Sequence, residues 1–218
     1  MGSGGSSGPR QPKSGNGPFG TASSSPMTNR GQGCGLALGE VEATMPRRIC
    51  VKGVSGAGKS TFGRDLAGRL GVPWIELDAL HHGPNWSAPT PEAFRARVRE
   101  AMDACPEGWV IDGNYDSKLG ETVLGTADTI VWLNLPLRTT FPRLWRRTIH
   151  RLRHDVELWN GNHETWRGNF ASRESLFLWT IRAHVRHRRQ WPSRFGADPR
   201  LVRLRSDAEV RRWLEVQH

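Results

Sequence analysis

From Ile49 onward, short runs of apolar residues alternate with longer stretches in which apolar residues recur every three or four positions. Short apolar runs bounded by glycine, proline or an acid are typical of buried strands, and the longer periodic stretches are typical of amphipathic helices. The predicted strands are residues 49–51, 73–77, 108–112, 127–136 and 201–206. The predicted helices are residues 61–70, 91–105, 137–153, 172–189 and 207–216.

This alternation predicts an α/β fold with three layers, in which a five-stranded parallel sheet lies between helices on both faces. In such sheets, ligands bind beyond the carboxyl ends of the strands. Three polar segments follow predicted strands: the glycine-rich residues 53–60, Asp78, and residues 112–115. We therefore expect these segments to meet at one edge of the sheet and to form the ligand site.

The N-terminal part of the chain has a different composition. Residues 1–45 are rich in glycine, serine and proline and show no periodic apolar pattern, so we expect a disordered tail. The working domain is then residues 46–218. Within it, residues 154–170 are polar and rich in glycine, asparagine and aromatic residues, which predicts a small lid. We expect neither a signal peptide nor a membrane-spanning helix, because no apolar run is long enough.

The charge and the cysteines narrow the class of protein. The net charge is +10, and it comes almost entirely from arginine. Such a surface suits nucleic acid, an anionic membrane or a phosphate-rich ligand, but a merely solvated basic face gives the same count. Cys34, Cys50 and Cys105 are widely spaced and odd in number, which favours neither a disulfide framework nor a structural zinc site. We therefore expect a cytoplasmic protein.

The most specific motif is GVSGAGKS at residues 53–60, which fits G-x-x-x-x-G-K-[ST] between a predicted strand and a predicted helix. Glycines allow successive backbone N–H groups to converge on phosphate oxygens, and the helix N-terminus adds its dipole. Lys59 would reach the β- and γ-phosphates, and the Ser60 hydroxyl would bind magnesium. The motif predicts ATP and Mg²⁺ as ligands. The expected nucleotide-binding residues are Gly53, Ser55, Gly56, Ala57, Gly58, Lys59, Ser60 and Thr61.

Two acids at strand ends are candidates for the chemistry. Asp78 is expected to orient the acceptor hydroxyl or a magnesium-bound water, although an acid there can also simply cap the end of a strand. Asp112 is expected to act as a second-sphere ligand of the magnesium that Ser60 binds. The alternative is that Asp112 only forms a turn with the glycine that follows it.

An acceptor pocket is expected between residues 78–86 and residues 112–115. The residues expected to bind the acceptor are Asp78, His81, His82, Trp86, Asp112, Asn114 and Tyr115. Adjacent histidines point apart and no third ligand lies at a suitable spacing, which disfavours zinc. Ordinary loop packing remains the alternative for the histidines.

Arginines in the predicted helix 137–153 are candidates for a lid clamp. Arg143 and Arg147 lie four residues apart on one helical face and would stabilise the transferring phosphoryl group, unless the helix is only a solvated basic surface. Arg173 and Arg182 are candidates for a second clamp. Trp159 and Trp166 would either stack on a base or pin the lid.

The order of these segments resembles that of adenylate-kinase-like P-loop proteins, with IDGNY (111–115) where adenylate kinases carry an Asp-Gly-Phe-Pro-Arg turn. Arg143 and Arg147, after LNLP (133–136), are similar in spacing to the lid arginines of nucleoside monophosphate kinases. More narrowly, GVSGAGKS, LDALHHGPNW, VIDGNY, ELWNGN and RESLFLW resemble a family of small bacterial proteins called DNA topology modulation proteins, over residues 46–216. The resemblance implies a nucleoside- or shikimate-kinase-like P-loop fold with a lid.

One departure from that pattern bears on the substrate. Where adenylate kinases use an arginine to grip the acceptor phosphate, this chain has Asp116. A monophosphate would meet a negative charge there, which argues against adenylate kinase activity.

The sequence therefore leads to two hypotheses. The first is a magnesium- and ATP-dependent phosphotransferase that acts on a small acceptor. The second is a regulatory ATPase that binds nucleic acid through arginine-rich helices, with an affinity that falls steeply with salt. A kinase needs Asp78 for turnover, whereas a nucleic-acid switch does not.

Overall fold

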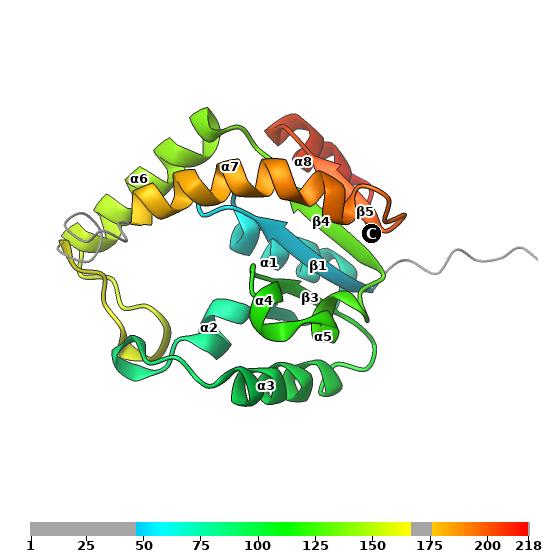
Figure 1. Cartoon of the computed structure of the whole chain (residues 1–218), viewed down its shortest axis with the longest axis horizontal. Helices are drawn as coiled ribbons and strands as arrows, with labels where there is room; N and C mark the ends of the chain where they lie inside the picture. The colour runs from blue at the N-terminus through cyan, green and yellow to red at the C-terminus, as the bar shows by residue number, and fades with distance from the viewer. Residues whose placement is uncertain (1–46, 167–175, 218) are drawn as a thin grey trace, which may run out of the picture. The chain divides into compact units, whose positions relative to one another are not determined.

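The computed structural model describes residues 47–166 and 176–217, and its centre is a parallel β-sheet (Figure 1). The strands are β1 (Arg48–Gly53), β2 (Trp74–Glu76), β3 (Trp109–Asp112), β4 (Thr129–Leu133) and β5 (Leu201–Leu204). Their order across the sheet is β2-β3-β1-β4-β5, and every neighbouring pair is parallel. The predicted five-stranded parallel sheet is confirmed.

Helices connect the strands. They are α1 (Lys59–Leu70), α2 (Leu77–His81), α3 (Pro91–Asp103), α4 (Asp116–Leu119), α5 (Glu121–Leu124), α6 (Leu137–Arg153), α7 (Leu176–Phe195) and α8 (Asp207–Glu215), with 3₁₀ turns η1 (Pro84–Trp86) and η2 (Trp159–Gly161). At the start of α3, the Thr90 hydroxyl accepts a hydrogen bond from the Ala93 N–H at 3.2 Å, as its predicted cap position requires.

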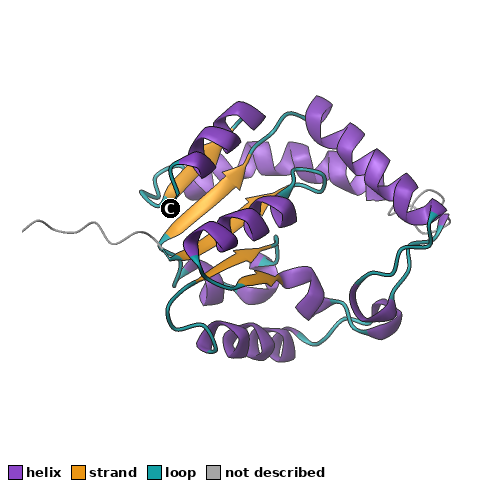
Figure 2. Ribbon diagram, turned by 180° about the vertical axis from the view of Figure 1, so that it is seen from behind, coloured by secondary structure: helices purple, strands orange, loops and turns teal. Residues whose placement is uncertain are grey.

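The sheet buries both of its faces, as the near-continuous apolar strands predict. Along β4, Ile130 and Trp132 face a cluster that includes residues of α3, α4 and α7, while Val131 and Leu133 face α1 and α8. Figure 2 shows the sheet from behind with helices on both sides of it. The three-layer arrangement therefore follows from side chains alternating across one sheet.

Some predicted boundaries were wrong. β2 ends at Glu76, so Asp78 lies in the first turn of the short helix α2 rather than directly at a strand end. The strand predicted to reach Pro136 stops at Leu133. The helix predicted for residues 172–189 is described as α7, which continues to Phe195. Residues 172–175 and the predicted tail, residues 1–45, lie outside the described residues.

Within residues 47–166 and 176–217, no helix combines the length and the apolar character that crossing a membrane requires.

A buried ion pair anchors the strand that leads into the glycine loop. Lys52 on β1 is 2% exposed, and its Nζ donates to the Asp116 carboxylate of α4 and, at 3.0 Å, to the Gly113 carbonyl oxygen. The second Asp116 oxygen accepts from Arg194 of α7 at 3.3 Å. The Asp116 carboxylate, at the position that matches the arginine of adenylate kinases, therefore pairs with two cationic side chains of the protein itself.

We predict that Asp116→Asn destabilises the protein by about 3–5 kcal/mol, because it leaves the Lys52 ammonium buried without a counter-charge. Arg194 is 46% exposed, so Arg194→Ala should cost less than about 1 kcal/mol. Urea unfolding of both variants measures the difference. Equal losses would contradict the assignment of Lys52 as the partner that matters.

Candidate active site

The glycine loop folds as its motif predicts, between β1 and α1. Gly56 and Gly58 have positive φ angles of 81° and 86°, a conformation that favours glycine. A Cβ at Gly56 would collide with the carbonyl oxygen of Thr140 in α6. The loop is therefore held closely against the start of α6, and Gly58, at the cap position of α1, has no side chain with which to cap the helix.

Lys59 and Ser60 open α1 and face the ligand side of the loop. The Lys59 Nζ lies 3.5 Å from the Val54 carbonyl oxygen. Burial lowers the pKa of Lys59, although Asp78 and Asp112 oppose that shift. An uncapped helix N-terminus with a lysine beside it is a site for a phosphate group.

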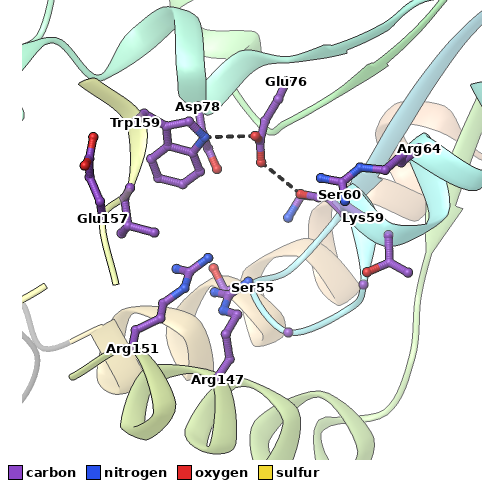
Figure 3. A pocket seen from close by; sticks show the side chains of 14 residues that line it. Ser55, Lys59, Ser60, Arg64, Glu76, Asp78, Arg147, Arg151, Glu157 and Trp159 are labelled. Carbon is purple, nitrogen blue, oxygen red and sulfur yellow. Dashed lines mark hydrogen bonds between the residues drawn. The ribbon is translucent and has the colours of Figure 1, made fainter. Parts of the chain in front are cut away.

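A cavity of about 550 Å³ lies in front of this loop (Figure 3). The glycine loop and the first turns of α1 form one wall, and the end of β2 with α2 forms another. The remaining walls come from α6 and from residues 157–159 of the predicted lid. Residues 154–166 of that lid are described, and residues 167–170 lie outside the description.

Two carboxylates line the cavity, Glu76 at the end of β2 and Asp78 in the first turn of α2. Glu76 accepts a hydrogen bond from the Ser60 hydroxyl at 3.0 Å through one oxygen, and from the Trp159 indole N–H at 2.8 Å through the other. Asp78 accepts from the Tyr115 hydroxyl at 2.7 Å. Glu76 was not among the predicted site residues. Two acids separated by one residue at the end of an apolar run were the signal that would have revealed it.

Asp112 lies behind the cavity wall at the end of β3. It is 1% exposed, and its carboxylate accepts a hydrogen bond from the Trp74 indole N–H at 3.2 Å. Burial raises the pKa of Asp112 to about 6, against the opposing effect of Lys59. Its charge therefore changes near neutral pH.

The arginines of α6 divide differently from the prediction. Arg147 and Arg151 line the cavity, whereas Arg143 does not and instead donates to Asp207 of α8 at 2.8 Å. Burial and the nearby Arg151 lower the pKa of Arg147, and Arg151 donates to Glu164 at 2.9 Å. The predicted pair is thus replaced by a pair one helical turn further on, because Asp207 at the start of α8 holds Arg143 aside.

His81 was expected in the acceptor pocket, but it lies in the protein interior. It is 6% exposed and packs against Phe94 and Tyr115, with ring centroids 5.1 Å and 4.6 Å away. Burial lowers its pKa to about 4, so the ring is neutral at pH 7. Its Nε2 contacts the Lys118 ammonium, and the ring is not part of the cavity walls.

His82 and Trp86 contact the lid instead of lining the cavity. The His82 ring stacks on Trp159 at 5.6 Å. The Trp86 backbone N–H donates to the Asn162 side chain at 2.7 Å, and its indole N–H donates to the His163 carbonyl oxygen at 3.2 Å. Of the two roles left open for Trp159, these contacts favour pinning the lid.

Asn114 and Tyr115 support other residues of the site. The Asn114 amide donates to the Gly53 carbonyl oxygen at 2.7 Å and accepts from the Gly53 N–H at 3.3 Å. It therefore fixes the start of the glycine loop, while Tyr115 fixes Asp78.

The remaining predicted residues divide between the cavity and other parts of the structure. Trp166 and Arg182 are exposed and are not part of its walls, and Arg173 lies outside the described residues. Ala57 is buried beneath the glycine loop, while Ser55 and Thr61 line the cavity.

Two curated relatives are shikimate kinases. The enzyme of Chlorobium chlorochromatii (strain CaD3) is 32% identical over 115 residues, which is 47% of this chain and 60% of the relative. That of Halorhodospira halophila (strain DSM 244 / SL1) is 31% identical over 123 residues, 51% of this chain and 65% of the relative. The chain thus spans less than two thirds of the length of either relative.

Two solved kinase structures are similar to this chain at low sequence identity. A shikimate kinase from Bacteroides thetaiotaomicron is 19% identical, covering 78% of this chain and 97% of that one, with a TM-score of 0.47. A gluconokinase from Sinorhizobium meliloti 1021 is 23% identical, covering 78% and 94%, with a TM-score of 0.44.

A family profile matches more than half of this chain. The shikimate kinase profile covers residues 55–190, from within the glycine loop through most of α7 and including all the walls of the cavity. This chain belongs to the shikimate kinase family.

Proposed function

We propose that the protein transfers the γ-phosphoryl group of ATP to a hydroxyl group of a small acceptor, with Mg²⁺ as cofactor. One observation supports this most directly. Lys59 and Ser60, the carboxylates of Glu76 and Asp78, and the guanidinium of Arg147 all line a single cavity (Figure 3). Phosphoryl transfer is catalysed by positioning and by electrostatic stabilisation, and it needs groups of these kinds facing one another.

The nucleotide end of the cavity is the glycine loop. The backbone N–H groups around Gly56 and Gly58 would hold the β-phosphate, and Lys59 would contact the β- and γ-phosphates. The Lys59 side chain starts out partly desolvated, which strengthens its interaction with an anion.

Magnesium would bind at the oxygen atoms beside the loop. The Ser60 hydroxyl and the Glu76 carboxylate are 3.0 Å apart, with Asp112 behind them as a second-sphere acid. All three are hard oxygen donors of the kind that Mg²⁺ prefers. When bound, the metal would neutralise part of the charge on the phosphates.

Asp78 would orient the acceptor. Its Oδ1 accepts a hydrogen bond from the Tyr115 hydroxyl, and its Oδ2 would accept one from the attacking hydroxyl. The new phosphorus–oxygen bond forms as the bond to the ADP oxygen breaks, and the hydroxyl proton passes to Asp78 or to solvent. Arg147 and Arg151 would stabilise the charge on the transferred group.

The family and the sequence likeness suggest narrower proposals. Because the curated relatives are shikimate kinases, shikimate is the first acceptor to test. The segments quoted above also support a placement near the DNA topology modulation proteins. Cys50 and Cys105 are free thiols, which suits a cytoplasmic location.

We predict that ATP and magnesium give ADP release that one acceptor pool stimulates, in an assay with shikimate, pooled nucleosides and other hydroxylated metabolites. Lys59→Ala and Asp78→Asn should each lower the stimulated rate by about 10²-fold or more, because each removes a group that acts on the transition state. Asp103→Asn, an exposed acid on α3, is the control. Stimulation by DNA alone, unchanged in Asp78→Asn, would favour the nucleic-acid ATPase.

We predict that two arginines of α6 differ in their effect on kcat. Arg147→Ala should lower kcat by about 10²-fold, because its guanidinium faces the cavity. Arg143→Ala should change kcat much less, because Arg143 pairs with Asp207 outside the cavity. Steady-state kinetics of both variants test this, and an equal loss in kcat would restore the pair expected from the sequence.

We predict that kcat/KM for ATP falls as the pH is lowered through about 6. Asp112 has a raised pKa of about 6, so its carboxyl group is an anion above that pH and neutral below it. The neutral form no longer attracts Mg²⁺. Asp112→Asn should have a lower plateau and should lack this limb of the profile. A limb that persists in Asp112→Asn would assign the ionisation to another group.

A further inference from the structure

A second cavity, of about 430 Å³, lies at the carboxyl ends of β4 and β5. Asn134, Pro136, Arg138, Arg188, Arg203 and Arg205 line it, and we call it the arginine cavity. None of these residues lines the cavity at the glycine loop. Three separate segments supply the arginines: the first turn of α6, α7, and β5 with the residue that follows it.

Arg203 is held rigidly in this cavity. Its guanidinium lies 4.4 Å from the centroid of the Trp132 ring. When the Asn134 amide is oriented so that its oxygen and its nitrogen both have suitable partners, the oxygen accepts hydrogen bonds from Arg203 Nη2 at 2.7 Å and from Arg203 Nε at 2.9 Å. Asn134 itself is only 7% exposed, and its backbone N–H donates to the Leu204 carbonyl oxygen at 2.7 Å. The floor of the cavity is therefore already ordered for binding.

The cluster lacks a counter-charge from the described part of the chain. Within the described residues, 47–166 and 176–217, no acid forms an ion pair with any of these four arginines. The two nearest acids in sequence have other partners. Asp207 pairs with Arg143, and Glu209 accepts from the Arg205 backbone N–H and the Ser206 hydroxyl.

The positive charges also act on one another. Burial lowers the pKa of Arg203, and the nearby Arg205 and Arg188 lower it further. Guanidinium groups remain protonated under such conditions, so the protein bears their mutual repulsion. An anion in the cavity would relieve that repulsion.

The amino end of α6 adds to the attraction. α6 is a helix of 17 residues that begins at this cavity, with Pro136 at its cap position, no capping side chain and no acid in its first turn. The positive end of its dipole is therefore left for an anion.

We propose that the arginine cavity binds a small molecule through its phosphate groups, at a site separate from the glycine loop. Arginine forks pair with two phosphate oxygens at once, and several converging forks suit a ligand with two or more phosphate charges. A merely solvated basic face would spread its arginines over a convex surface, whereas these converge on a hollow of ligand size. The site does not depend on the phosphotransferase activity proposed above.

The test uses the full chain and inorganic diphosphate as the probe. Lys59→Ala serves as the background, because it weakens binding of the probe at the glycine loop. Isothermal titration calorimetry should show binding to Lys59→Ala, and adding Arg138→Gln and Arg188→Gln should weaken it by about tenfold or more. Arg189→Gln in the same background is the matched control, since it removes the same charge from the next position of α7, outside this cavity. It should change the affinity by no more than about twofold.

Thermal unfolding of each variant shows that it is folded. If the double substitution unfolds the protein, Arg188→Gln alone gives the same comparison, because Arg188 is exposed on α7. Absence of diphosphate binding to Lys59→Ala, or equal affinity with and without the cavity arginines, overturns the proposal. A single-stranded oligonucleotide forms the second arm. If only the oligonucleotide binds, and its binding is lost with Arg138 and Arg188, the cavity recognises a polynucleotide and the proposal of a small ligand is wrong.

Discussion

The carboxylate of Glu76 joins the three parts on which the site depends. One oxygen receives the Ser60 hydroxyl from the first turn of α1, and the other receives the Trp159 indole from the lid. The residue itself ends β2, at the edge of the sheet where the ligand would lie. Any ligand that takes Ser60 or Glu76 as a partner must therefore exchange one of these hydrogen bonds. Trp159 also stacks on His82, which directly follows α2. A ligand that breaks the hydrogen bond between Trp159 and Glu76 would therefore also affect the segment that carries Asp78.

Contacts from the turn after β3 hold the end of β1, which leads into the glycine loop. Asn114 satisfies both backbone groups of Gly53, and one residue earlier the Lys52 ammonium is buried against Asp116 and the Gly113 carbonyl oxygen. Both contacts come from the turn after β3, so a single segment fixes the end of β1 from its flank. A buried charge is costly unless it is fully paired. That cost is what makes the arrangement specific, because a shifted register of β1 against β3 would leave Lys52 unpaired.

The parts that sequence predicted well have a strong local signal. The period of apolar residues gave the strands and the long helices, and the spacing of glycines and Lys59 gave the phosphate loop. The parts it missed depend on contacts between distant segments. Nothing near Arg143 indicates that Asp207, 64 residues later, would pair with it. His81 is a core residue because Phe94 and Tyr115 surround it, and neither neighbour is visible from the motif that contains it. Helices of four or five residues, such as α2 and α4, are too short to show a period.

Part of the positive charge of the chain is gathered at the two cavities. At the glycine loop, the cations Lys59, Arg147 and Arg151 face the acids Glu76 and Asp78, a mixture that suits both phosphate and a metal ion. At the arginine cavity, no acid of the described residues lines the walls, which favours an anion over a cation. The shared scaffold explains why the two lie at one edge: in a parallel sheet, every strand delivers its following residue to the same side. The excess of arginine is therefore partly concentrated into a second concave site, and a uniform coding bias toward arginine would not by itself place four guanidinium groups around one hollow.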